Sequence, residues 1–344
     1  MMPDKILVRN VNRDFKIDFL RALAIMLIIM AHIKTSKDTG IIFQLRSFDV
    51  PLMCMLVGMT SYLSFNKKGE KYGKYLMKRF KRLIIPMWIF VSLYLGFSLL
   101  NKILFDVSFP SITSIVTSYI PIWGIGYIWI IRVYFTIAIV VPAIYKLSLR
   151  FSSIVQKILI LFFLLVVHQI LCYIESFFSG FVLTVYQQIF PISSGYIIIA
   201  LIGMWVIQQK PSHTLTMFCF FGILCGLSLS YYEFDPISSH KYPPDIYYIS
   251  YGVAISLLLY LLLGKMMAFS NILGHKFVFW ISSNSLEMYY WHVFFAEMLC
   301  RQCSNIHWSI RFIIVIAITI VITYFQLKFV PALYKGNFEK GVKE

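Results

Sequence analysis

Apolar residues recur along the whole chain in blocks of about 17 to 26 residues, separated by short polar segments. Each block is close to the roughly 20 residues that a helix needs to cross a bilayer. The pattern predicts about ten transmembrane helices, at 17–33, 48–65, 83–101, 121–145, 158–175, 182–207, 214–231, 246–263, 277–299 and 311–328. Because these blocks fill most of the 344 residues, we expect an all-α, polytopic helix bundle that forms one domain over 1–344.

The basic residues between the blocks predict how the helices are oriented. When successive polar segments are assigned to alternate sides, about 22 Lys and Arg residues fall on one side and about seven on the other. Cytoplasmic loops carry such an excess, so we expect both termini in the cytoplasm, as an N-terminal segment 1–16 and a tail 329–344. No small-residue cleavage site follows the first apolar block, which therefore reads as a retained helix and not as a removed signal.

The composition supports a membrane protein, since 59% of the residues are hydrophobic and only 13% are charged. The net charge of +16 is explained by the cytoplasmic loops and by attraction to anionic lipid headgroups, so no nucleic-acid partner is expected. No phosphate-binding glycine loop is present. Cys300 and Cys303 form a single CxxC pair, which without further ligands is weak evidence for redox chemistry and predicts no metal site.

The first apolar block contains charged residues at a regular spacing, in the stretch DFLRALAIMLIIMAH. Arg21 and His32 are eleven residues apart, so they share one helix face at an axial separation of about 16.5 Å. Asp18 lies one turn before Arg21 and can pair with it. Such residues normally face a bundle interior and predict function, with an anionic group held near Arg21 and proton transfer at His32. The alternative is an interfacial ion pair and a polar residue at the helix end.

The segment 66–82, NKKGEKYGKYLMKRFKR, contains eight basic residues, more than topology requires. Arg79 and Arg82 are three residues apart and would share a helix face. Guanidinium groups bind phosphate in a bidentate manner, so this segment could hold a polyanionic cofactor.

Several of these stretches together resemble the acyltransferase-3 family of bacterial integral membrane acyltransferases. IDFLRALAIMLIIMAH is similar to the arginine and histidine signature of its first helix, and FDVPLMCMLVGMTSYLSF to its second helix. YLMKRFKRLIIPMW is similar to its Arg-x-x-Arg stretch, and SNSLEMYYWHVFF to its late serine, tyrosine and histidine segment. The tryptophan-containing stretch YIWIIRVYFTIAIVVPAIY matches more loosely, because Arg132 stands where an apolar residue is usual, and Val57 replaces a usual serine.

The resemblance implies an enzyme that transfers an acyl group, most often acetyl from acetyl-CoA, to a sugar hydroxyl of a cell-surface polysaccharide, O-antigen or lipid-linked glycan. It implies a multi-pass protein of the bacterial inner membrane. His32 is then expected as the general base, since imidazole titrates near neutral pH. Arg21, Arg79 and Arg82 are expected to bind the acetyl-CoA donor.

Further polar residues are candidates for the substrate pocket: Asp18, Asp49, Arg132, Tyr289 and His292. His292 has a depth along its helix similar to that of His32, so the two could meet. Asp49 could orient His32 or simply cap the second helix. The segment 238–252 could stack tyrosines on sugar rings or anchor the interface.

A transporter or exporter of a surface glycan is the competing class, because intramembrane Arg and His residues also line transport paths. An enzyme should join a cytoplasmic donor site to an outer pocket, whereas a carrier should show two similar halves around a midplane site.

Overall fold

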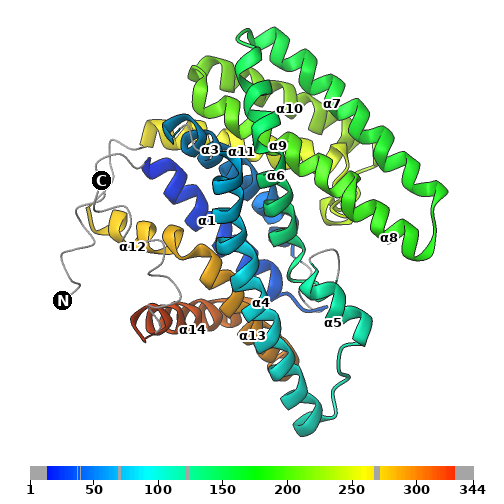
Figure 1. Ribbon diagram of the computed structural model, residues 1–344, viewed down its shortest axis with the longest axis vertical. Coiled ribbons are helices and arrows are strands. Elements are labelled where there is room, and N and C mark those ends of the chain that lie inside the picture. The colour runs from blue at the N-terminus through cyan, green and yellow to red at the C-terminus, as the bar shows by residue number, and fades with distance from the viewer. Residues whose placement is uncertain are drawn as a thin grey trace.

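The computed structural model describes residues 14–36, 38, 40–68, 71–120, 124–266 and 272–329. Within these ranges the chain is helical and contains no strand of a sheet (Figure 1). The proposed terminal segments 1–16 and 329–344 lie almost wholly outside the described residues. The first half of the chain forms α1 (Phe15–His32), α2 (Ile42–Leu45), α3 (Asp49–Lys68), α4 (Tyr72–Phe105), α5 (Ile112–Tyr119), α6 (Trp129–Arg150) and α7 (Ile154–Ile174).

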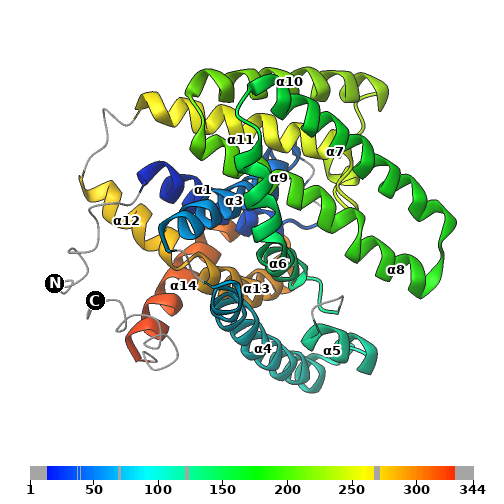
Figure 2. The same cartoon turned by 45° about the horizontal axis from the view of Figure 1, so that its top comes forward.

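The second half of the chain continues the bundle with seven helices. They are α8 (Gly180–Ile189), α9 (Pro191–Gln208), α10 (Pro211–Tyr231), α11 (Ile246–Met266), α12 (Ile272–Ser283), α13 (Ser285–Gln302) and α14 (Trp308–Phe329). Short 3₁₀ turns η2 (Arg46–Phe48), η3 (Glu175–Phe177) and η4 (Ile237–His240) join some of them. Figure 2 shows α7 and α8 beyond α9 on one flank and α12 and α14 on the other.

Eight helical segments in the described chain are long and apolar enough to cross a membrane. The other two expected spans correspond to α1 and α13, which are shorter and contain several charged residues. These two helices run in the same direction, because Asp18 near the start of α1 contacts Ser282 just before α13, while His32 at its end contacts His292. We call the end of the bundle that contains His32 the histidine end, and the end that contains Asp18 the arginine end.

The centre of the bundle is built around α9, whose residues are nearly all buried. Two glycines let α3 and α9 approach each other closely. A Cβ atom at Gly58 would lie 1.9 Å from the Ala200 carbonyl oxygen, and one at Gly203 would lie 2.0 Å from that of Met55. Small residues at helix crossings are the usual way in which membrane helices gain packing contacts. This contact fixes α3, and with it the residues that begin α3 at the histidine end.

Several expected helices differ from the sequence pattern; the one expected at 121–145 starts at Trp129, as α6. α4 starts eleven residues before the expected 83, because basic residues of the segment 66–82 form its first turns and not a loop. The expected helix 182–207 is divided before Pro191, which has no N–H to continue a helix and stands at the first position of α9. The expected helix 277–299 is broken at Asn284, so α13 starts afresh there.

The orientation of the bundle is a prediction that cysteine labelling can test. In a background without the native cysteines, we expect Ser239→Cys to react with an external, membrane-impermeant thiol reagent and Gly73→Cys to be spared. Both positions are exposed, and a Cβ at Gly73 meets open space, so neither change disturbs packing. The Lys and Arg asymmetry places them on opposite sides. Labelling of residue 73 alone would reverse the orientation.

Candidate active site

Two histidines from distant parts of the chain meet at the histidine end. His32 is the last residue of α1, and His292 lies in the buried face of α13. The Nδ1 atom of His32 is 2.6 Å from Nε2 of His292, and the two rings are nearly parallel. The contact expected from the similar depths of the two residues is therefore present.

The hydrogen bonds of this pair determine which nitrogen of His32 is available for chemistry. The Nδ1 atom of His292 lies 3.2 Å from the carbonyl oxygen of Met288, which can only accept, so Nδ1–H of His292 donates to it. Nε2 of a neutral His292 is then an acceptor, and Nδ1–H of His32 donates to it. The Nε2 atom of His32 keeps its lone pair. His292 thus holds His32 in the tautomer that a general base requires.

A small cavity of about 30 Å³ lies beside His32. It has room for a water molecule or a group of similar size. The Tyr289 hydroxyl donates to the Tyr127 carbonyl, and both rings pack edge-on against His32. The cavity is lined by Ile28, His32, Val50, Trp129, Ile130, Lys241, Tyr242 and Tyr289. The wall is therefore mainly apolar and aromatic, and it contains one imidazole, that of His32, and one ammonium group, that of Lys241.

The cation of this cavity, Lys241, comes from the connection between α10 and α11. Its ammonium nitrogen lies 5.6 Å from the centre of the Trp129 ring and 5.3 Å from that of Tyr242. Burial lowers the pKa of Lys241, and the carboxylate of Asp49 opposes this change. Arg46 is close enough for its charge to act on both His32 and Lys241. Lys241 is therefore the cation that lines the cavity, and Arg46 and Asp49 lie within electrostatic range of it.

The segment that carries Lys241 is held in place by His168 of α7. Nε2 of this buried histidine lies 2.6 Å from the Pro244 carbonyl oxygen, and Nδ1 lies 2.8 Å from the Ser194 hydroxyl. Gly195 leaves room for this contact, since a Cβ there would lie 3.0 Å from the Pro244 ring. His168 thus has a structural role, because one ring nitrogen contacts the loop and the other contacts α9.

At the arginine end, Asp18 and Arg21 point into the bundle. Asp18 is buried, and its carboxylate accepts a hydrogen bond of 2.6 Å from the Ser282 hydroxyl. Arg21 lies near enough to Tyr134 of α6 for its charge to act on that hydroxyl. The charge of Asp49, from the opposite end, acts on the same hydroxyl. Tyr134 therefore lies within electrostatic range of charged groups from both ends of the bundle.

Arg79 and Arg82 lie on α4 at the arginine end. The guanidinium carbon of Arg79 is 5.2 Å from the centre of the Tyr75 ring, so Arg79 is braced by the aromatic face. Arg82 is exposed and lies within electrostatic range of Glu287 in the first turn of α13. Both guanidinium groups thus lie near the point where α4 meets α13. Lys67 and Lys68, from the same basic segment, have side chains outside the described set.

The comparison with known families decides the class of the protein. The family model of the acyltransferase-3 domain, described as an acyltransferase domain, matches residues 14–326. The chain belongs to this family. No curated protein and no solved structure is similar enough to the chain to be matched. The protein is therefore a multi-pass membrane acyltransferase, and the described helices that match the family contain both the histidine pair and the two α4 arginines.

Two predicted pocket residues of the acyltransferase have other contacts. The Asp49 carboxylate pairs with Arg46 and accepts from the Val50 backbone N–H, so His292 and not Asp49 is hydrogen-bonded to Nδ1 of His32. Arg132 is buried on α6 and donates to the Gln188 carbonyl at 2.5 Å. It does not line the cavity beside His32.

Sequence patterns missed Lys241 and Arg46 of the acyltransferase as candidates. Both lie in polar segments between helices, where a basic residue is ordinarily an interfacial anchor. The aromatic segment 238–252 was a signal for this site, because Tyr242 of that segment lines the cavity. Lys241 and Arg46 lie near the cavity because α3 packs against α9 and α11, and the periodicity of the sequence does not reveal this packing.

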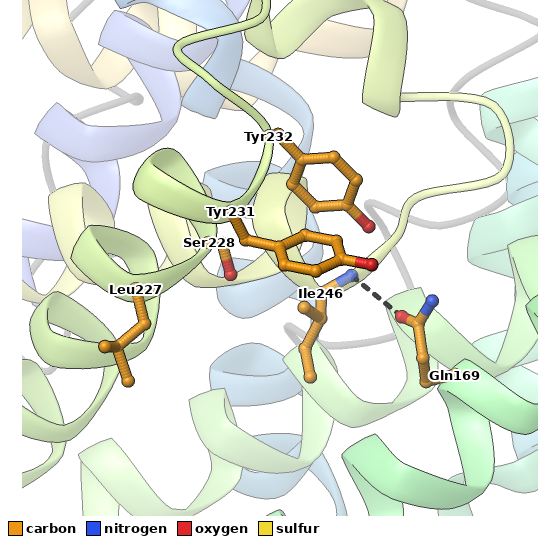
Figure 3. Close-up of a pocket in the computed structure, with 6 residues that line it drawn as sticks. All are labelled: Gln169, Leu227, Ser228, Tyr231, Tyr232 and Ile246. Atoms are coloured by element: carbon orange, nitrogen blue, oxygen red, sulfur yellow. Dashed lines mark hydrogen bonds between the residues drawn. The ribbon is translucent and has the colours of Figure 1, made fainter.

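A larger cavity of about 450 Å³ lies between α7, α10 and α11, away from the histidine pair. Figure 3 shows its wall and the 3.4 Å hydrogen bond from the Ile246 backbone N–H to Gln169. It is lined by Gln169, Leu227, Ser228, Tyr231, Tyr232 and Ile246. These residues include no histidine and no charged side chain, so the acyl-transfer chemistry is better assigned to the smaller cavity.

Proposed function

We propose that this acyltransferase is a bacterial inner-membrane O-acetyltransferase. It moves an acetyl group from cytoplasmic acetyl-CoA to a hydroxyl of a cell-surface polysaccharide, such as an O-antigen, or of a lipid-linked glycan. The observation that carries the proposal is the contact between His32 and His292, which leaves the lone pair of His32 Nε2 as the base beside a small cavity. The arginines at the opposite end support the assignment of the donor.

The proposed reaction needs a base, a fixed geometry and a route for one proton. The acceptor hydroxyl gives its proton to Nε2 of His32 while its oxygen attacks the thioester carbonyl. The tetrahedral intermediate then collapses, the coenzyme A thiolate leaves, and the proton passes from His32 to the thiolate. Throughout, His292 accepts the hydrogen bond from Nδ1–H and stabilises the transient imidazolium, as the third group of a catalytic triad does.

The donor is proposed to enter from the arginine end. Arg79 and Arg82 present planar guanidinium groups that suit the phosphates of coenzyme A. Arg21 lies further along the path, and about 16.5 Å of helix separates it from His32. The thioester end of the donor must reach that depth, so the interior between α1 and α6, where Tyr134 lies, is the proposed course of its arm.

Replacing Arg79 and Arg82 together with glutamine is expected to weaken acetyl-CoA binding without unfolding the protein. Each charged hydrogen bond lost should cost about 1.5–3 kcal/mol. Calorimetry on protein in lipid would measure the affinity. The matched control is Lys74→Gln with Lys81→Gln, which removes two exposed charges from the same helix. Equal affinities of the two double variants would remove the donor role from Arg79 and Arg82.

Mass spectrometry of surface glycan tests the proposed function in cells. Glycan from cells that contain the protein should be heavier by one acetyl group per modified residue than glycan from cells that lack it. The His32→Ala protein should give the lighter glycan. An exporter would instead change the amount of surface glycan while leaving its mass unchanged, so either that result or equal masses would contradict the proposal.

A further inference from the structure

Charge is distributed unevenly around the cavity that holds His32. Lys241 lines the cavity, and its ammonium contacts two aromatic rings, while no carboxylate among the described residues forms an ion pair with it. Asp49, the carboxylate of the described residues whose charge acts on Lys241, is already paired with Arg46. The Nε–H of Arg46 is buried and has no hydrogen-bond partner within the described part of the chain. The free protein therefore leaves positive charge uncompensated at this site.

Uncompensated positive charge and an unpaired buried donor lower the stability of a folded protein unless an anion or an acceptor contacts them. A buried cation is stabilised by a paired anion, and an unpaired donor inside a protein costs roughly 1–3 kcal/mol. Aromatic faces offset only part of this cost. The backbone of this lysine also lies on a loop that His168 holds through Pro244, and its ammonium lies against the rings of Trp129 and Tyr242. A fixed, uncompensated cation beside a substrate pocket is the usual design for binding an anion.

We propose that the acceptor of this enzyme bears an anionic group, a sugar carboxylate or a phosphate, close to the hydroxyl that is acylated. Lys241 binds this group, with the Arg46 and Asp49 pair behind it. Trp129 and Tyr242, which meet edge-on with ring centres 5.0 Å apart, flank the sugar. This inference rests on the proposed function for the identity of the acceptor as a glycan, but the binding preference does not depend on acyl transfer.

Binding of matched glycosides without any acyl donor tests the proposal. The probes are the methyl glycosides of glucuronic, galacturonic and mannuronic acid, each compared with its neutral parent sugar, together with glucose 6-phosphate. With protein in neutral-lipid nanodiscs, at least one anionic probe should bind about 10- to 100-fold more tightly than its neutral partner. The acids and the phosphate, taken separately, show which anionic group is preferred. No binding, or equal binding within every pair, would overturn the proposal.

Variants of Lys241 show whether the anionic probe binds to this lysine or is attracted by the overall positive charge of the protein. Lys241→Met should remove the preference for the anionic probe and leave neutral sugars bound as before, whereas Lys241→Arg should keep the preference. Lys34→Met is the matched control, since Lys34 is an exposed lysine two residues after His32 whose ammonium packs over Phe43 and not at the cavity. The proposal would be overturned if the Lys241→Met protein melted at the wild-type temperature and still bound the anionic probe more tightly than the neutral one.

The same variants distinguish substrate binding from stabilisation of the reaction's oxyanion. If Lys241 binds the acceptor anion, Lys241→Met should raise the KM for the anionic acceptor and change kcat little. A fall in kcat for charged and neutral acceptors alike would assign the lysine to the oxyanion and contradict the proposal. If acyl transfer proves absent but the anionic probe still binds through Lys241, the proposed function fails while this inference stands.

Discussion

Replacing His32 with alanine is expected to reduce glycan acetylation by about 10²–10⁴-fold, the usual contribution of general acid–base catalysis. Acetyl-CoA affinity should stay close to that of the wild type, because the proposed phosphate contacts lie at the arginine end. The measurements are acetylation rate and donor affinity on the same purified protein in lipid. Transfer at a near wild-type rate would refute the assignment of His32 as the base.

Two further histidine variants refine this expectation. His307→Ala is the control, since His307 is exposed in the turn between α13 and α14, on the same end of the bundle, and should leave the rate unchanged. His292→Gln should lose less activity than His292→Phe, because the glutamine carbonyl can still accept from Nδ1–H of His32. If both His292 variants were as active as the wild type, the orienting role of His292 would be wrong.

The largest expected effect on stability comes from the pair of Asp38 and Arg311. Arg311 is fully buried at the start of α14, and it donates to the Asp38 carboxylate and to the Ser304 carbonyl oxygen. Asp38 also accepts from the backbone and hydroxyl of Thr35. Asp38→Ala leaves a buried guanidinium without its counter-ion, which should lower the free energy of unfolding by about 3–5 kcal/mol.

Thermal melting in detergent micelles would measure this loss, with two comparisons. Arg301→Ala removes a half-exposed partner of Glu297 and should cost no more than about 1 kcal/mol, as surface pairs do. Asp38→Leu combined with Arg311→Met should recover most of the loss, because it removes both charges at once. If Asp38→Ala melts at the same temperature as Arg301→Ala, the pair does not anchor the segment that follows His32.

The all-helical fold and most of the spans could be predicted from the sequence, because each span must be apolar along its length. Polar residues inside α1 were informative for the same reason, and counting depth along two helices was enough to bring His32 and His292 together. Helix breaks were harder to predict. Asn284 divides an apolar stretch without a proline, and the many basic residues at the start of α4 mask the apolar face formed there by Tyr75 and Phe80.

The contacts of the loops could not be predicted from periodicity. Lys241 reaches the cavity because α11 packs against α3 through Gly252 and Pro51, and because His168 holds Pro244. Each of these contacts joins residues far apart in the sequence. The ion pair between Arg46 and Asp49 could not be predicted from periodicity either. Because Asp49 is paired in this way, His292 is the partner of His32. The proposed base could therefore be chosen from one helix, whereas the groups around it depend on the packed bundle.

In the proposed reaction, the donor reaches the site from the cytoplasmic side of the membrane and the acceptor reaches it from the opposite side. Proteoliposomes loaded with acetyl-labelled acetyl-CoA and given acceptor glycan outside test this directly, because the donor does not cross the bilayer and the protein can insert in either direction. We predict label in the external glycan with wild-type protein, and none with His32→Ala or when the donor is supplied only outside. Label that appears when donor and acceptor are both outside would contradict the account.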